Sequence, residues 1–153
     1  LMATFYHLLD HYLDLPPTDW VARYRQTDEL GLAAALKAMQ ARQQKTHPER
    51  GPSLSPAGYV GVFRDPWYGT ATISRDANGL RISMDRTPGL QGPLEHVQYD
   101  TFRTHWTKPG LEDAYVTFAL HPDGSIDQMT MQAISPVADF SWDYQDLHFS
   151  PDK

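Results

Sequence analysis

The sequence contains no cysteine, and this absence limits its chemistry. A chain without thiols forms no disulfide bond, offers no thiolate nucleophile and holds no cysteine-ligated zinc or iron–sulfur centre. The sequence also has no apolar run of the roughly 20 residues that a membrane-spanning helix requires. We therefore expect neither a disulfide framework nor a membrane span.

Positive charge is scarce as well. The 153 residues carry 13 Lys and Arg against 19 Asp and Glu, which gives a formal net charge of -6. No run of basic residues concentrates positive potential, and a phosphate backbone is bound chiefly through Lys and Arg, so nucleic acid is not a predicted partner. The length suits one domain with a single core and an appended helical segment.

The first third of the chain has helical periodicity, so we assign residues 1–45 to a helical segment. Residues 2–13 place apolar side chains at helical spacing. Pro16-Pro17 ends that pattern, because proline disfavours helix in itself and in the residue before it. Thr18 is predicted to cap a second helix that runs to about residue 44. The apolar faces of these helices predict self-association or docking on another domain.

Residues 46–56 contain three prolines, one glycine and two serines, a composition typical of an exposed linker. Beyond this linker the hydrophobic period changes from helical to two, and eight strand-like runs follow with turn residues between them. In the first run Tyr59, Gly61 and Phe63 share one face. We therefore assign residues 57–150 to a mainly β domain.

Two of the later strands have distinctive patterns. Ile126, Met129 and Met131 do not keep one parity, which predicts a β-bulge near Asp127-Gln128 in the seventh strand. The eighth strand is predicted over residues 140–149, from the alternation of its aromatic side chains.

Short strands at nearly even spacing are typical of a β-sandwich or of an up-and-down barrel. Closure into an eight-stranded antiparallel barrel is favoured, because it leaves no exposed edge and lets neighbours in sequence be neighbours in space. A barrel of this size is either filled by its own side chains or holds one small ligand. The sequence leaves both outcomes open.

A small apolar or aromatic ligand in the barrel would be lined by aromatic side chains whose polar tips orient the guest. Packing alone also accounts for aromatic residues on strands, and a filled core is the simpler interpretation. The candidate lining residues are Trp67, Tyr68, His105, Trp106, Tyr115 and Trp142.

No catalytic residue, metal or other cofactor is predicted. Ser150 begins a Ser-x-x-Lys match, but a proline follows the serine and the companion motifs Ser-Asp-Asn and Lys-Thr-Gly are absent. His7 and His11 share a helix face as metal-binding pairs do, yet no third ligand is identifiable. The histidines of the strand region have no carboxylate or hydroxyl residue at a sequence spacing that would indicate a catalytic pair.

Several short motifs occur in a fixed order between residues 57 and 149. They are Tyr59-x-Gly61-x-Phe63, Tyr68-Gly69, Asn78-Gly79-Leu80-x-Ile82, Leu94-x-His96-x-x-Tyr99-Asp100-Thr101-Phe102, and Phe118 ahead of Asp123-Gly124. This succession resembles the uncharacterised domain that follows the catalytic domain in many β-lactamase-related serine hydrolases of the class C, penicillin-binding-protein-like type. One departure is Val97, where that family often has tryptophan.

The resemblance implies a lipocalin-like β-barrel and an exported bacterial parent protein, periplasmic or extracellular, with a serine hydrolase domain upstream. The start at Leu1-Met2, directly in a helical pattern, leads us to expect an excerpt from that longer protein. The motif residues to which the resemblance gives structural roles are Tyr59, Gly61, Phe63, Gly69, Asp100 and Phe102.

We therefore expect a non-catalytic accessory domain of a β-lactamase-like serine hydrolase. It would pack against the catalytic domain of the same polypeptide or shape access to its site. The alternative is a lipocalin-like binding domain for a small apolar or aromatic ligand. An enzyme in its own right is the weakest of the three hypotheses, since no nucleophile and base can be named.

Overall fold

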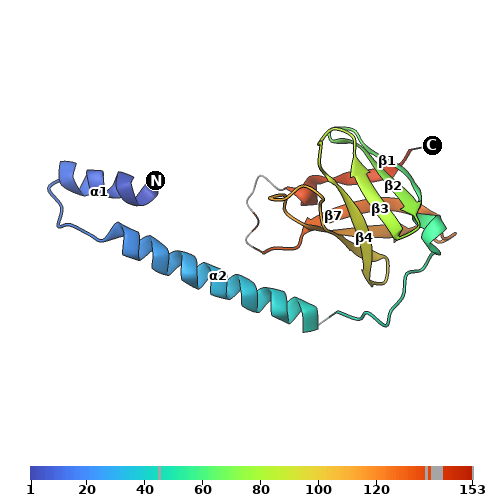
Figure 1. The fold of residues 1–153 in the computed structure, drawn as a ribbon, viewed down its shortest axis with the longest axis horizontal. Coiled ribbons are helices and arrows are strands. Elements are labelled where there is room, and N and C mark those ends of the chain that lie inside the picture. The colour runs from blue at the N-terminus through green and yellow to red at the C-terminus, as the bar shows by residue number, and fades with distance from the viewer. Residues whose placement is uncertain (45, 137, 139–142, 153) are drawn as a thin grey trace. The chain divides into compact units, whose positions relative to one another are not determined.

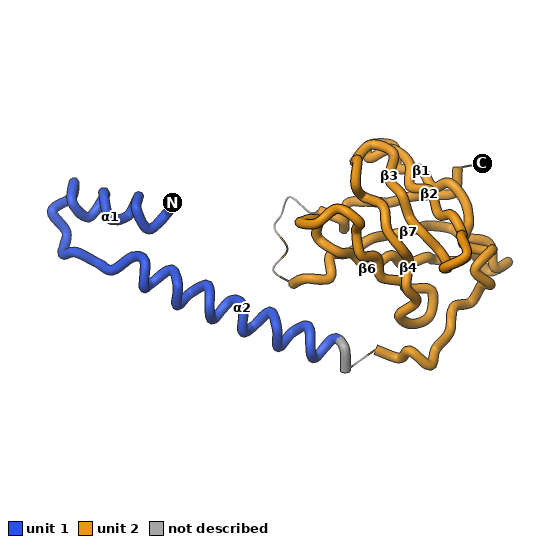
Figure 2. Tube along the Cα trace, in the orientation of Figure 1, with its two compact units in different colours: residues 1–42 blue, residues 43–153 orange. Residues whose placement is uncertain are grey.

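The computed structural model describes residues 1–44, 46–136, 138 and 143–152. The chain divides into two compact units, residues 1–42 and residues 43–153 (Figure 2). The first unit is helical, and the second contains the strands that the structure describes.

The helices are α1 (Met2–Tyr12) and α2 (Trp20–Gln44), close to the predicted bounds, and the helical unit comprises α1 and α2 up to residue 42. The Asp19 carboxylate accepts a hydrogen bond from the Ala22 amide at 2.9 Å, which is the geometry of an N-cap. The prediction that Thr18 caps this helix is therefore wrong by one residue.

The two helices contact each other through aromatic rings and a hydrogen bond. The Tyr6 and Trp20 rings stack with their centroids 4.8 Å apart. The Trp20 indole N–H donates to the buried Asp10 carboxylate at 2.6 Å. Many large apolar side chains of this unit are exposed: Phe5, Leu8, Tyr12, Leu13, Leu30, Leu32, Leu36 and Met39.

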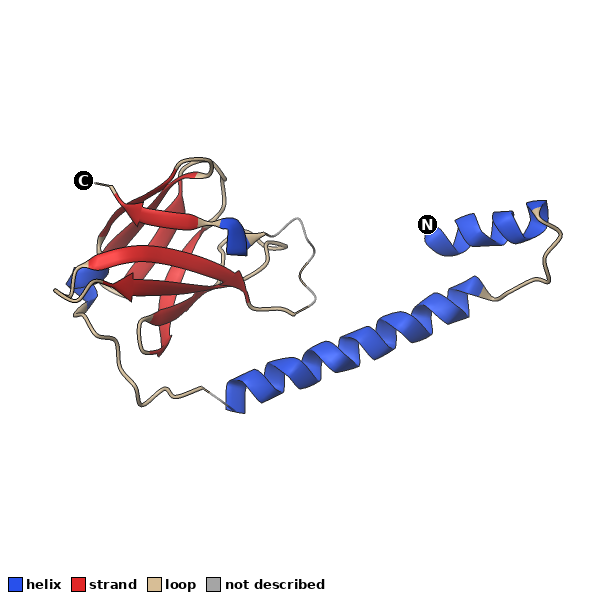
Figure 3. Cartoon of the chain, turned by 180° about the vertical axis from the view of Figure 1, so that it is seen from behind, coloured by secondary structure: helices blue, strands red, loops and turns tan. Residues whose placement is uncertain are grey.

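The β unit is a closed antiparallel barrel in which each strand pairs with the next and β8 returns to pair with β1 (Figure 1; Figure 3). The prediction of an eight-stranded up-and-down barrel after N-terminal helices is confirmed. The strands are β1 (Gly61–Asp65), β2 (Gly69–Asp76), β3 (Gly79–Met84), β4 (Gln91–Gln98), β5 (Thr101–Thr104), β6 (Ala114–Leu120), β7 (Ile126–Ala133) and β8 (His148–Pro151), with 3₁₀ turns η1 (Pro56–Tyr59) and η2 (Tyr144–Asp146).

The barrel closes through a short contact between β1 and β8, which we call the closing seam. Phe63 pairs with Pro151 and Arg64 pairs with Ser150. By contrast, β1 and β2 pair over five residues each. The seam is therefore a part of the sheet with little backbone pairing.

The last strand is shorter and begins later than predicted. β8 starts at His148, and Tyr144 lies in η2. The predicted strand is wrong over residues 143–147 and right at residues 148–149. An aromatic residue at an alternating position also suits a turn that places its ring in the barrel end. Phe140 and Trp142, the other aromatics of that pattern, lie outside the described residues.

The irregularity predicted in the seventh strand is present. Ala119 pairs with Gln128 and Leu120 pairs with Ile126, which leaves Asp127 without a partner on β6. This extra residue forms the predicted β-bulge. The bulge lets both halves of β7 direct apolar side chains inward despite the change of parity.

Gly69 marks the point where the chain turns into β2. Its φ is +88°, and a Cβ at this position would lie 2.5 Å from a carboxylate oxygen of Asp85. Both the backbone angle and the space favour glycine.

Candidate functional site

Side chains fill the interior of the barrel. Tyr59 is fully buried, and its ring centroid lies 5.1 Å from that of Phe102 and 5.0 Å from that of Phe118. Other buried side chains of this core are Phe63, Ile73, Ile82, Val116, Met129 and Phe149. Because a close-packed interior has no room for a guest at its centre, a ligand site is expected at the ends of the barrel.

The five candidate lining residues that the structure describes do not line one common cavity. Trp67 and Tyr68 lie in the turn between β1 and β2, and Trp67 is 85% exposed. His105 is exposed, Tyr115 is half-buried at an outward position of β6, and Trp106 is buried. Trp142 lies outside the described residues.

Trp106 closes one end of the barrel together with Tyr144. The Trp106 indole N–H donates to the Glu112 carbonyl at 2.7 Å and to the Tyr144 hydroxyl at 3.0 Å. The Tyr144 hydroxyl donates to the same carbonyl at 2.6 Å. The polar tips of both rings are thus engaged within the protein, so Trp106 acts in packing.

A pocket of about 470 Å³ lies at the other end of β5, where that strand begins. Its apolar floor is formed by core side chains, and Pro52 and Pro56 of the linker segment form one wall. Polar groups of β2 and β4 stand at its rim. We call this space the mouth pocket, with floor residues Tyr59, Leu80, Leu94 and Phe102 and rim residues Arg75 and His96.

The Asp100 carboxylate fixes the linker segment beside the mouth pocket. It accepts hydrogen bonds from the Ser53 amide at 2.9 Å, from the Ser53 hydroxyl at 2.7 Å and from the Tyr59 hydroxyl. Nearby, the Tyr99 amide donates to the Arg50 carbonyl at 2.7 Å. The wall that contributes Pro52 is therefore held against the β4–β5 hairpin, so the pocket is preformed.

These hydrogen bonds separate the acidities of Asp100 and Tyr59. Burial alone would raise the pKa of the Asp100 carboxyl, but the donors on Tyr59 and Ser53 outweigh burial and lower that pKa. Burial, followed by the hydrogen bond to Asp100, raises the pKa of Tyr59 to about 12. The pair is a neutral phenol donating to an ionised carboxylate at neutral pH.

The rim of the mouth pocket is polar because the inward-facing residues of two strands change there from apolar to charged or polar. On the inward side of β2, Ile73 is buried and the next residue on that side is Arg75. On the inward side of β4, Leu94 is buried and His96 follows. His96 Nε2 is 2.9 Å from the Tyr99 carbonyl oxygen, and since a carbonyl only accepts, Nε2 carries the proton.

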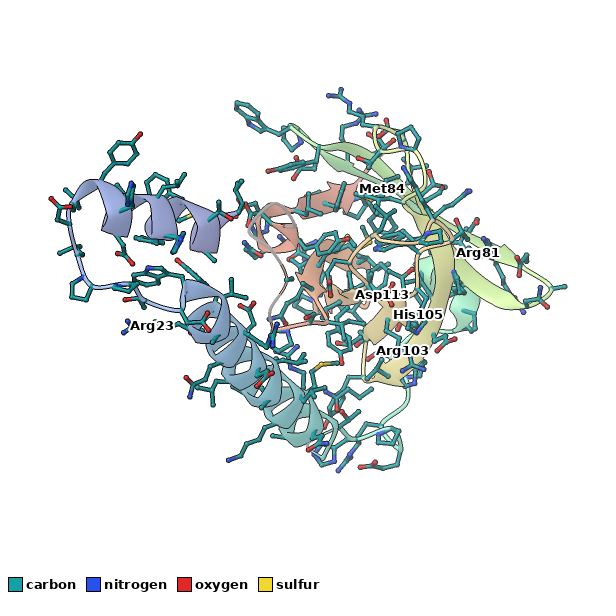
Figure 4. All side chains as sticks on the ribbon, turned by 60° about the vertical axis from the view of Figure 1, so that its left-hand side comes forward. Arg23, Arg81, Met84, Arg103, His105 and Asp113 are labelled. Atoms are coloured by element: carbon teal, nitrogen blue, oxygen red, sulfur yellow. The ribbon has the colours of Figure 1, made fainter. Side chains whose placement is uncertain are left out.

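A histidine–carboxylate pair lies on the outside of the barrel. His105 donates through Nδ1 to the Asp113 carboxylate, which also accepts the Trp106 amide at 3.2 Å (Figure 4). Activation of a serine, threonine or tyrosine nucleophile of this chain would need its hydroxyl within hydrogen-bond reach of the imidazole. Among the residues that the structure describes, no such hydroxyl bonds to His105. The Asp113 carboxylate joins the two ends of the segment between β5 and β6 through its contacts with His105 and Trp106.

One protein family matches the barrel together with its linker. A family model described as a domain of unknown function, DUF3471, matches residues 45–151. The chain belongs to this family. The region that matches DUF3471 runs from the linker segment, which forms one wall of the mouth pocket, to the end of β8.

One solved structure similar to the DUF3471 chain is described as "Crystal structure of SurE with D-Leu". The identity is 20%, the TM-score is 0.45, and the match covers 60% of this chain and 20% of that one. The chain thus spans a fifth of the length of the solved protein. No curated protein matches it.

The histidines and acidic residues of the described ranges do not form a metal centre. Within those ranges, no three His, Asp or Glu side chains lie close enough together to hold a metal ion. His7 and His11 border the same surface hollow on α1 as Asp10, but the Asp10 carboxylate accepts the Trp20 indole N–H. None of the described helices is long and apolar enough to span a membrane.

Sequence reasoning did not identify Arg75 and His96 as site residues. Arg75 lies near a hairpin turn, where charged residues are common, and His96 has no local partner in the sequence that marks it as a site residue. The available signal was strand parity, since both residues continue an inward-facing series. Extended to the strand end, that series places both residues at the rim of the pocket.

Proposed function

We propose that this DUF3471 barrel is a non-catalytic accessory domain of a β-lactamase-like serine hydrolase. It would follow the catalytic domain in an exported bacterial protein and pack against that domain or shape access to its site. The observation that carries the proposal is the position of the motif residues behind the family resemblance.

Those motif residues build the barrel. Tyr59, Phe63 and Phe102 are core side chains, and Gly69 occupies a turn at positive φ. Asp100 accepts hydrogen bonds that fasten the linker segment to the barrel. A motif made of packing and turn residues is what a structural domain preserves, whereas an enzyme motif would contain a nucleophile and its base.

The strand position of Ser150 also supports an accessory role. A Ser-x-x-Lys nucleophile requires the serine at the start of a helix, so that the lysine returns over it one turn later. Ser150 lies in β8 and pairs with Arg64 of β1. An extended backbone cannot bring the side chain three residues later over this hydroxyl.

The helical unit supports a partner domain. Its exposed side chains include Phe5, Leu8, Leu32 and Leu36, which the unit itself does not cover. Apolar surface of this extent favours contact with another protein surface. The upstream catalytic domain of the same polypeptide is the proposed partner, and self-association is the competing outcome.

The alternative of a lipocalin-like carrier has less support. A carrier of that kind holds its guest inside the barrel, and here core side chains such as Ile73, Val116 and Met129 are almost entirely buried against one another. This argument concerns a guest in the barrel interior and does not apply to a small ligand bound at the end of the barrel.

Two measurements test the accessory role. The reading frame upstream of Leu1 is expected to encode Ser-x-x-Lys and Tyr-x-Asn; a frame with a signal peptide and neither motif would contradict the proposal. Incubation of the chain with a fluorescent penicillin and with a fluorophosphonate probe is expected to give no covalent label. The parent protein, treated alongside, is expected to be labelled at the serine of its Ser-x-x-Lys motif.

A further inference from the structure

We propose that the mouth pocket binds a small organic carboxylate with an apolar, ring-sized body. The proposal does not depend on a hydrolase partner, because it concerns only groups within the β unit. The apolar body would lie against the floor side chains Leu80, Leu94 and Phe102, with the fully buried Tyr59 behind them, and the carboxylate would meet Arg75 at the rim.

The size and make-up of the pocket fit such a ligand. Small-molecule sites are commonly concave spaces of about 300–1,000 Å³, mostly apolar, with a few polar groups that fix orientation. The mouth pocket has about 470 Å³ and joins an aromatic and aliphatic floor to polar lining groups, which are the guanidinium of Arg75, the imidazole of His96 and the carboxylate of Asp76. The pocket is therefore large enough for an aromatic ring with a short acidic side chain.

The charge of the rim selects an anion. Among the described residues, Arg75 forms no ion pair, so its guanidinium is free to receive a ligand carboxylate in a bidentate manner. Asp76 also lines the pocket and Asp100 lies beside it, but both carboxylates already have partners within the protein. Asp76 accepts the Asn78 amide at 2.7 Å and lies 3.9 Å from Arg81, while Asp100 is held by Ser53 and Tyr59.

His96 adds a second polar contact. Its Nε2–H is committed to the Tyr99 carbonyl, so Nδ1 is the nitrogen left for a ligand. Neutral Nδ1 accepts a hydrogen bond and protonated Nδ1 donates one. A carboxylate therefore gains a second donor when the imidazole is protonated, while a ligand with a hydroxyl or amide beside its acid group can donate to the neutral ring.

Arg75 and His96 lie at inward-facing strand positions. This placement favours a role in ligand binding over that of a charged residue on the outer surface. Surface arginines of strands lie at outward positions, as Arg103 does on β5, where it pairs with Glu95 at 2.7 Å (Figure 4). Arg75 instead continues the inward series of β2 above a hydrophobic floor. An inward guanidinium over apolar side chains is suited to a ligand that has both an acid group and an apolar part.

The test is a titration of the full, ¹⁵N-labelled chain with three probes of one shape: phenylacetate, phenylacetamide and benzylamine. Phenylacetate is expected to give saturable amide shifts that include Leu80, Leu94 and His96. Phenylacetamide is expected to bind more weakly, and benzylamine to leave these amides unchanged. Equal shifts with all three probes, or none with phenylacetate, would overturn the proposal.

Two variants isolate the charge. Arg75→Gln is expected to raise the Kd for phenylacetate about tenfold, as the loss of a charge-assisted hydrogen bond predicts. Arg103→Gln removes the same charge from the outer face of β5 and is expected to leave that Kd unchanged. Both positions are exposed, so the variants are expected to retain the wild-type amide spectrum away from the substitution. The same Kd in both variants would show that Arg75 is not the receptor group.

Discussion

The Asp65 carboxylate accepts a hydrogen bond from the backbone amide of His148 at 3.0 Å, although the two residues are 83 positions apart. Its other oxygen accepts the amides of Trp67 at 2.8 Å and Tyr68 at 2.9 Å. One buried side chain thus joins the β1–β2 turn to the start of β8, beside the closing seam. Three charge-assisted hydrogen bonds reinforce a contact that has few backbone pairs of its own.

Replacing Asp65 is expected to weaken the whole barrel. Asp65→Ala leaves three amides without their acceptor, so we expect the free energy of unfolding to fall by about 3 kcal/mol. Asp65→Asn retains one oxygen but turns an amide nitrogen toward a donor, and it is also expected to destabilise. Urea unfolding followed by tryptophan fluorescence measures both.

The matched control is Asp127→Asn. Asp127 is an exposed carboxylate of β7 whose partner is His121 at 3.3 Å, and its substitution is expected to change stability by less than about 0.5 kcal/mol. Equal stability of the Asp65 and Asp127 variants would rule out the role given to Asp65 at the closing seam.

The acid limb of the stability profile is expected to depend on Asp65 and Asp100. Burial raises the pKa of Asp65, but its three amide donors outweigh burial and lower it, and the pKa of Asp100 is lowered as well. A lowered native pKa means that the stabilisation is complete above the unfolded value of about 3.9 and is lost as pH falls through the native pKa. The difference in unfolding free energy between wild type and Asp65→Asn should therefore shrink below about pH 4. A constant difference down to the acid transition would contradict this.

The alkaline limb is expected to report on two tyrosines. Burial first, and then the bond to Asp100, raises the pKa of Tyr59 to about 12. Burial, with the charges of Glu112 and Asp113, raises the pKa of Tyr144 to about 12. The unfolded chain ionises near pH 10 while the folded chain keeps both protons, so stability is expected to fall as pH rises from about 10 to about 12.

Ultraviolet titration of tyrosinate absorbance measures these late ionisations directly. Tyr59→Phe and Tyr144→Phe are each expected to remove one ionisation from the high-pH end of the curve. A wild-type curve that is complete before the high-pH range, in a chain that is still folded by circular dichroism, would be inconsistent with both burial and hydrogen bonding.

The corner beside the mouth pocket is expected to matter for folding. Phe102→Ala removes a ring that contacts Tyr59 and Phe118 in the core, and we expect a loss of about 3–5 kcal/mol. Asp100→Ala removes the acceptor for Ser53 and Tyr59, with an expected loss of about 1–3 kcal/mol. Thermal denaturation gives both values, and wild-type stability in both variants would show that this corner is not structural.

The exposed faces of the helical unit are expected to cause self-association when no partner domain is present. Leu32→Gln with Leu36→Gln keeps helix-favouring residues while removing apolar surface from α2. The sedimentation coefficient of the wild type is expected to rise with concentration, and that of the double variant to stay constant. Val62→Thr on the outer face of β1 serves as the control. A monomeric wild type at every concentration would contradict this expectation.

Strand periodicity was informative wherever local alternation matched the pleat. The inward series of β3 and β6, with Ile82, Val116 and Phe118 buried, follows from the sequence alone. The bulge at Asp127 was visible because apolar residues that change parity within one strand can all face inward only if the strand holds an extra residue. These features depend on residues close together in the chain, and such patterns are the ones that a single sequence records.

The failures concern contacts made across long distances in sequence. The alternation of aromatic residues predicts Tyr144 in a strand, but Tyr144 lies in the turn η2, where its hydroxyl donates a hydrogen bond to the Glu112 carbonyl. For Trp106, a candidate lining residue, nothing local in the sequence shows that the same carbonyl accepts its indole N–H. Hydrophobic periodicity does not indicate such hydrogen-bond partners, because closure of the barrel brings these residues together.

The closing seam also determines when the molecule can finish folding during synthesis. β1 emerges from the ribosome long before His148–Pro151, the four residues of β8 that complete the circle. Until then its outer edge has unsatisfied amide and carbonyl groups, which are open to chaperones and to other nascent chains. Closure is therefore a late step whose timing depends on the delivery of one short strand.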